Sequence, residues 1–96
     1  MNQAQMMRLQ KMQREMMAAQ EKLEQTVFTG TAGGGVVKAE IKGTHEVLSI
    51  EIDKEALADD PEMVQDMIVL AINDANKKIE AETKKALGGF GGMGLF

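Results

Sequence analysis

The chain has 96 residues and a net charge of −4 at pH 7, from fifteen acidic and eleven basic side chains. It contains no cysteine, which excludes disulfides, thiolate metal sites and a cysteine nucleophile and fits a reducing cytoplasm. We expect a soluble, cytoplasmic protein, since no run of about 18 apolar residues and no amino-terminal apolar segment is present. A domain of this size buries a modest fraction of its surface, so we also expect a partner subunit.

The first predicted element is an amino-terminal helix, residues 1–25, with its helical pattern clearest from residue 4 onward. This segment lacks Gly and Pro and is rich in Met, Gln, Lys, Arg and Glu, which are good helix formers. A helix of about 22 residues is about 33 Å long, more than so small a domain needs, so part of it should project. Its apolar positions step by three and four residues, as in a helix that packs along another helix: Leu9, Met12, Met16, Ala19 and Leu23.

Residues 26–53 are predicted to form a three-stranded antiparallel meander. Apolar and polar residues alternate in VVKAEIK and in EVLSIEID, which is typical of strands with one buried face. A weaker strand covers about residues 27–32, and the glycines at 33–35 and the segment GTHE supply the turns. His45 is interpreted as a turn residue. The exposed edges of such a sheet again favour a partner. The residues expected on the buried faces are Val37, Ala39, Ile41, Leu48, Ile50 and Ile52.

A carboxy-terminal helix is predicted over residues 60–87. In DDPEM, Asp60 is expected to cap the helix, Pro61 suits its first turn, and Glu62 complements the positive end of the helix dipole.

The two halves of this helix differ in apolar content. Nine of the thirteen residues from 63 to 75 are apolar, so we expect this half to be buried on most sides. Residues 76–87 have a narrower apolar stripe and should leave the core. The pair Gly88 and Gly89 is expected to end the helix, with residues 88–96 as a flexible Gly-rich tail.

Charge is segregated along this predicted fold. We expect about residues 1–14 and 77–96 to lie side by side as a two-helix arm, with seven basic and two acidic side chains and a net charge of +5. Residues 15–76 have four basic and thirteen acidic side chains, a net charge of −9. Basic helices of this kind suit phosphate backbones. The candidate DNA-binding residues are the seven basic side chains of the arm: Arg8, Lys11, Arg14, Lys77, Lys78, Lys84 and Lys85.

A purely structural role for the four lysines is a competing interpretation. Lys84 and Lys85 complement the negative end of the helix dipole, and Lys78 and Lys84 each follow an acidic residue by four positions. Arg8 and Lys11 are more informative. Positive charge near a helix amino terminus opposes the dipole, and these two residues also lie one turn apart with like sign.

No catalytic or metal-binding set is apparent. His45 has no second His and no Cys with which to bind a metal. The segment GTAGGGVV lacks the ending of a phosphate-binding loop and precedes a strand rather than a helix. No nucleophile, base and orienting residue can be named together. We therefore expect a protein that is not an enzyme and has no cofactor, metal or small-molecule substrate.

Several segments resemble the YbaB/EbfC family of bacterial nucleoid-associated proteins, over essentially the whole chain. They are MMRLQKMQREMMAAQEKL, GGGVVKAEIKGTHEVLSIEID, MVQDMIVLAINDANKKIEAET and the Gly-rich end, and the most specific is DMIVLAINDANKK. The resemblance implies an α-β-β-β-α protomer, a tweezer-like homodimer with paired helical arms, and DNA binding that helps organise the nucleoid. Genes of this family often lie beside a recombination mediator gene, which implies a link to recombination or repair.

The residues and the resemblance together predict an α+β homodimer that binds double-stranded DNA at the nucleoid. No aromatic residue interleaves with the basic ones, so contact with the phosphate backbone is favoured over base readout. The alternative is a protein-interaction adaptor whose Met-rich helices hold a client segment. A less favoured alternative makes the first helix and GFGGMGLF a membrane-surface anchor.

Overall fold

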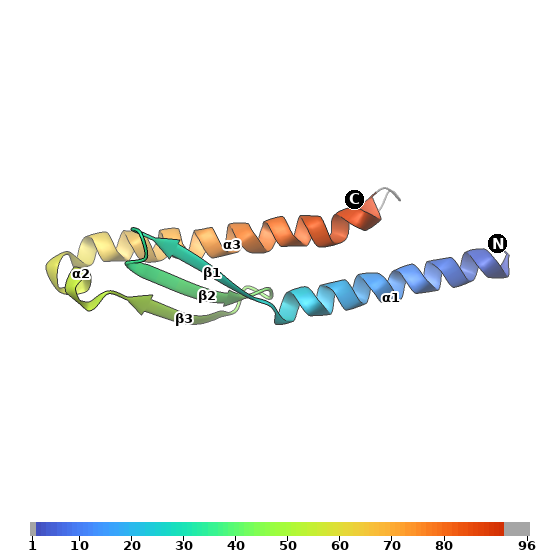
Figure 1. The fold of residues 1–96 in the computed structure, drawn as a ribbon, viewed down its shortest axis with the longest axis horizontal. Helices are drawn as coiled ribbons and strands as arrows, with labels where there is room; N and C mark the ends of the chain where they lie inside the picture. Colours follow the sequence, from blue (N-terminus) through green and yellow to red (C-terminus); the bar gives the residue numbers. More distant parts are fainter. Residues whose placement is uncertain (1, 92–96) are drawn as a thin grey trace.

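The protein is an elongated rod with principal extents of 68 × 20 × 15 Å. The computed structural model describes residues 2–91, without the side chains of residues 87 and 89–91. Figure 1 shows one long helix lying along a small sheet and a second long helix leaving that sheet, so that the chain begins at the far end of the rod. The elements in order are α1 (Gln3–Gln25), β1 (Val27–Ala32), β2 (Val37–Lys42), β3 (Val47–Ile52), α2 (Lys54–Asp59) and α3 (Pro61–Gly91).

The predicted α+β class and the three-stranded meander are confirmed. The sheet has the order β1-β2-β3 with both pairs antiparallel, and Ala39 of β2 lies opposite Gly30 of β1 and Ile50 of β3. The β1–β2 turn contains three glycines with positive φ, a conformation that costs glycine little. His45 also has positive φ, at 71°, in the β2–β3 turn, as its assignment to a turn implies. The short helix α2 was not predicted.

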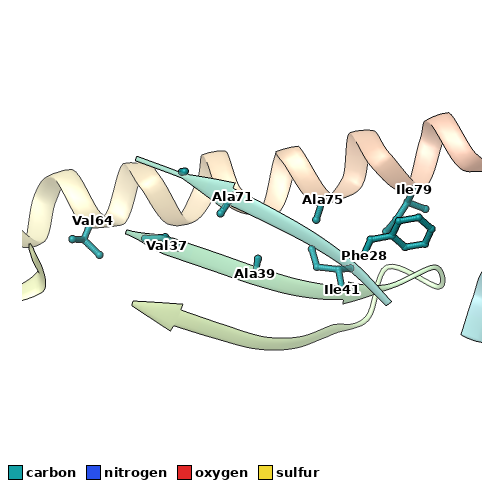
Figure 2. Close-up of a cluster of buried hydrophobic side chains, with 9 residues drawn as sticks. Phe28, Val37, Ala39, Ile41, Val64, Ala71, Ala75 and Ile79 are labelled. Atoms are coloured by element: carbon teal, nitrogen blue, oxygen red, sulfur yellow. The ribbon is translucent and has the colours of Figure 1, made fainter. Parts of the chain in front are cut away.

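The core lies between one face of the sheet and α3 (Figure 2). Helix α3 packs on β1 and β2 rather than on β3. It approaches β1 closely at Gly30, where an added Cβ would overlap the Ala71 carbonyl and lie 2.9 Å from the Ala75 Cβ. Small residues on both elements therefore set the spacing between helix and sheet. The buried residues are Phe28, Ala32, Val37, Ala39, Ile41, Val64, Ala71, Ala75 and Ile79.

The first half of α3 is less buried than its composition predicts. Val64 and Ala71 are buried, but Val69 is 57% exposed and Leu70 is 59% exposed. The expectation that this half is buried on most sides is wrong for the isolated protomer. One three-stranded sheet covers only one side of a helix, and α2, which also contacts α3, leaves Val69 and Leu70 exposed.

The start of α3 agrees with the prediction, but its end does not. At its start, the Met63 N–H donates to Asp60 Oδ1 (3.1 Å), which confirms Asp60 as the cap. At its end, the helix continues to Gly91, four residues beyond the expected end at Leu87. Glycine costs a helix about 1 kcal/mol per residue relative to alanine, but extending a helix that already exists avoids the cost of nucleation. Residues 92–96 of the predicted tail lie outside the described residues.

Candidate nucleic-acid interface

Helix α1 is an exposed helix that touches the rest of the protein along one narrow stripe. None of its residues is buried, and its only half-buried positions are Met12, Met16, Ala19 and Leu23. These are four of the five positions predicted to pack, while the fifth, Leu9, is 42% exposed. The expected projection of α1 is therefore confirmed, and it involves the amino-terminal half of the helix (Figure 1).

The carboxy-terminal end of α1 is held against the turn between β2 and β3. The Gly43 N–H donates to the Thr26 carbonyl (3.0 Å), and the Thr26 hydroxyl donates to the Lys22 carbonyl (2.7 Å). Leu23 packs on the edge of the core. A Cβ at Gly43 would overlap the Leu23 carbonyl, so the absence of a side chain at Gly43 allows the helix to lie this close. The direction of α1 is thus fixed by its last turn.

Within the described residues, 2–14 of α1 and 77–91 of α3 do not lie side by side, as the two-helix arm expected from residues 1–14 and 77–96 would require. Helices α1 and α3 run antiparallel, and Ala86 of α3 lines the same hollow as Ala19 and Leu23 of α1. Residues 77–86 therefore lie beside residues 19–28. With equal rise per residue, the described end of α3 reaches about the level of residue 15 of α1. We call the part of α1 beyond it, residues 2–14, the α1 arm.

The α1 arm carries three basic residues and no acidic one. Arg8, Lys11 and Arg14 are all exposed, and with Met7 and Gln10 they line a shallow hollow of about 230 Å³ on the helix surface. Lys11 Nζ lies 4.0 Å from Glu15 Oε1, and both side chains are more than half exposed. A surface ion pair of this kind contributes little, so Lys11 remains available for a ligand.

Lys78 has a structural role, as the competing interpretation of the lysines proposed. Its Nζ donates to the Thr29 carbonyl of β1 (2.6 Å) and lies 3.6 Å from Asp74 Oδ2. Asp74 Oδ2 in turn accepts from the Thr31 N–H (3.0 Å). This backbone hydrogen bond is the main cause that lowers the pKa of Asp74 below its usual 3.8; partial burial opposes it, and Lys78 and Lys77 support it. The Asp74 and Lys78 side chains together join α3 to the edge strand β1.

The other three lysines of α3 are exposed and lie apart from the α1 arm. Lys77 lies near Asp74, which bonds to β1, whereas Lys84 and Lys85 precede Ala86, which lines a hollow with Ala19 and Leu23 of α1. Among the ion pairs of the described side chains, none joins Glu80 to Lys84. The seven candidate residues thus form separate groups along the rod, and only Arg8, Lys11 and Arg14 share one surface.

Three further observations concern function. His45 Nδ1 lies 3.0 Å from Asn76 Oδ1, so this histidine joins the β2–β3 turn to α3; its sequence neighbourhood gave no signal of that contact. Within the part of the chain that the structure describes, no three His, Cys, Asp or Glu side chains are grouped so as to hold a metal ion. None of the described helices is long and apolar enough to cross a membrane.

Similar proteins identify the class of protein. The chain is 42% identical to a nucleoid-associated protein of Hyphomonas neptunium over 92 residues, which cover 92% of this chain and 86% of the relative. It is 48% identical to a nucleoid-associated protein of Chloroflexus aurantiacus over 82 residues, which cover 83% and 82%. The crystal structure of an uncharacterised protein of Helicobacter pylori, HP0035, has the same fold, with a TM-score of 0.75 and 30% identity over 94% of this chain and 97% of that one.

The first two of these relatives are named nucleoid-associated proteins, and the third shares the α+β fold of this chain. The model of the YbaB/EbfC DNA-binding family matches residues 1–94. The chain belongs to this family, and the resemblance noted in the sequence is confirmed.

Proposed function

We propose that the protein is a homodimer that grips duplex DNA with its α1 arms, mainly through the phosphate backbone, and thereby helps to organise the nucleoid, with a link to gene expression or to recombination and repair. The observation that carries this proposal is the α1 arm itself. The helical part of the arm, residues 3–14, is exposed except at the half-buried Met12, and with three cations and no anion it projects from a body that is otherwise acidic. Membership of a DNA-binding family supports DNA as the ligand.

The length of the arm reduces the repulsion between DNA and the acidic body. The first acidic residue after the arm is Glu15, which pairs with Lys11. The next is Glu21, which lies about 20 Å from Arg8 along the helix. The Debye length at physiological salt is about 8 Å, so the field of the body is largely screened at the arm. Phosphates near Arg8 therefore experience the local positive charge rather than the net charge of the protein.

Among the α3 lysines, we propose Lys77, Lys84 and Lys85 as secondary phosphate contacts. They are exposed, but each follows an acidic residue of α3 within a few positions, whereas the α1 arm contains no acidic residue. Lys78 should contribute least, because binding a phosphate would compete with its bonds to Thr29 and Asp74.

An apolar surface that the protomer leaves open supports the homodimer. On β3, Leu48 is exposed and Ile50 and Ile52 are only half-buried, because α3 does not cover this strand. Val69, Ile72 and Asn76 lie on one stripe of α3, with Val69 one helical turn from Ile72 and two turns from Asn76. Asn76 contacts His45 in the β2–β3 turn, so this stripe faces the β3 side of the protein. Exposed apolar patches of this kind mark protein interaction sites. A second copy covering this surface would bring two α1 arms to one duplex, which raises the effective concentration of the second arm.

The DNA-binding proposal is tested with two variants of equal charge change. In one, Arg8, Lys11 and Arg14 are replaced by Gln; in the matched control, the body residues Lys38, Lys42 and Lys54 are replaced by Gln. Fluorescence anisotropy with a labelled duplex is recorded from about 50 to 200 mM salt, where phosphate contacts lose affinity steeply. The arm variant should bind more weakly on every sequence, and its slope of log K against log salt should be shallower by about 0.9 for each phosphate that it no longer neutralises.

The control variant should bind almost as wild type does. Equal weakening in both variants would show that only net charge matters, and unchanged binding in the arm variant would remove the proposed contacts. Either result would reject the arm as the DNA-binding element.

The dimer surface is tested with a pair of neighbouring substitutions. Val69→Asp places a charge on the stripe that faces β3, whereas Leu70→Asp places one on the other side of α3, where the exposure is almost the same. Analytical ultracentrifugation should find the Val69→Asp protein shifted to monomer and the Leu70→Asp protein still dimeric. The reverse pattern would move the interface to the opposite side of α3.

A further inference from the structure

We propose that one stripe of the α1 arm reads base edges in the major groove, so that the protein prefers certain sequences in addition to binding phosphates. The stripe consists of Gln3, Met7, Gln10 and Arg14. This inference rests on the proposed DNA binding and extends it from the phosphate backbone to the bases.

The four residues form a continuous line on an exposed helix. They are spaced by four, three and four positions, which places them along one side of a helix with 3.6 residues per turn. All four are exposed, and α1 is unbroken from Gln3 onward. The half-buried stripe through Met12 and Met16 lies on the opposite side of the helix, so packing against the body leaves this line accessible.

Cations flank the line on one side. Arg8 and Lys11 border the same hollow as Met7, Gln10 and Arg14. A helix about 10–12 Å wide fits the major groove of B-DNA, which is about 12 Å wide. If the line faces the base pairs, Arg8 and Lys11 face one phosphate strand. Phosphate contacts would then fix the orientation of the helix, and the line would supply the sequence information.

The chemistry of the line predicts the preferred bases. A glutamine amide pairs with N6 and N7 of adenine, an arginine with O6 and N7 of guanine, and an apolar side chain packs on the thymine methyl group. The line is about 17 Å long, which corresponds to about five base pairs at 3.4 Å each. The expected site is therefore a short A·T-rich stretch with one G·C pair at the end nearest the body of the protein.

The same line ends abruptly at the base of the arm. Continuing with the same spacing, it passes Met17 and reaches Glu21, whose carboxylate would repel phosphates. Base reading is thereby limited to the α1 arm. In the sequence these Gln and Arg residues look scattered, and only the helix places them in one row.

The experiment removes single atoms from the major groove without changing the phosphates or the minor groove. The probe is a labelled 20-base-pair duplex of A·T-rich pentamers, each ending in one G·C pair. A second version has 7-deazaadenine in place of adenine, which removes the N7 acceptor, and a third has uracil in place of thymine, which removes the methyl group. Wild-type protein should bind the 7-deazaadenine duplex about fivefold or more weakly, and the uracil duplex more weakly as well.

Each variant of the line should lose only the difference in DNA affinity that depends on the substituted residue. The double variant Gln3→Ala, Gln10→Ala should no longer distinguish adenine from 7-deazaadenine, and Met7→Ala should no longer distinguish thymine from uracil. The matched controls Gln13→Ala and Met6→Ala change the same residue types on the same arm but outside the line. Both controls should keep the full discrimination.

The outcomes separate this inference from the proposed function. Equal wild-type affinity for all three duplexes, with a steep salt dependence, would overturn base reading and leave phosphate binding in place. Equal weakening on all three duplexes in the Gln3, Gln10 variant, together with a smaller mass in ultracentrifugation, would instead assign the line to a protein interface and overturn the inference. Absence of binding to every duplex at low salt would overturn both proposals.

Discussion

Gly43→Ala should redirect the α1 arm, because Gly43 supports the last turn of α1. An added Cβ would overlap the Leu23 carbonyl oxygen and lie only 2.6 Å from its carbon, whereas ordinary contact begins at 3.4 Å. Helix α1 must therefore move by about 1 Å at Leu23. If α1 tilts as a rigid body about Thr26, about 4.5 Å away along the helix, the displacement grows to about 4 Å at Gln13 and about 6 Å at Arg8.

A distance measurement between α1 and α3 tests this tilt. The described chain contains no free cysteine, so nitroxide labels can be attached at Gln13→Cys and Asn73→Cys without removing native thiols. Double electron–electron resonance on labelled protein diluted with an excess of unlabelled protein reports the distance within one protomer. The Gly43→Ala protein should show a maximum shifted by up to about 4 Å and weaker DNA binding, because the cations of the arm no longer meet the same phosphates.

The control is Gly88→Ala, where an added Cβ meets nothing within 4 Å. This variant should keep both the distance and the DNA affinity. An unchanged distance in Gly43→Ala, accompanied by a lower free energy of unfolding, would show that the sheet rather than α1 yields to the added methyl group. That result would refute the account of how the arm is oriented.

Two further predictions concern stability. Gly30→Ala should lower the free energy of unfolding, measured in urea, by about 3 kcal/mol or more, the upper part of the range for overpacked cores. The loss is large because the added methyl group meets the backbone of α3 rather than a movable side chain. A change below about 1 kcal/mol would contradict the close approach of β1 and α3. Asp74→Asn should lower the thermal unfolding midpoint at neutral pH, and the difference from wild type should disappear in acid. The pKa of Asp74 is depressed in the folded state by the Thr31 N–H, so the stabilisation is complete above the ordinary pKa of 3.8 and is lost as the pH falls through the folded-state value. A difference that persists unchanged at the lowest pH would assign the effect to packing instead.

The sequence by itself determined the local structure of this protein. The repeat of apolar residues in α1, the alternation in β2 and β3, and the capping residue Asp60 each act over a few positions, within one element or at its end. Such signals depend on backbone geometry and neighbouring side chains, so they can be read without knowing the fold. The three cations of the α1 arm were found in the same way, because all three lie on one helix.

Only the tertiary structure decided how these elements meet. The alignment of α1 with α3 depends on the contact between Gly43 and Leu23, which are 20 positions apart, and it separates lysines that the sequence placed beside the α1 cations. Lys78 finds the Thr29 carbonyl 49 positions away, which no local pattern encodes. The exposure of Val69 has the same origin, since burial depends on how much surface a neighbouring layer covers and not on how apolar the residue is.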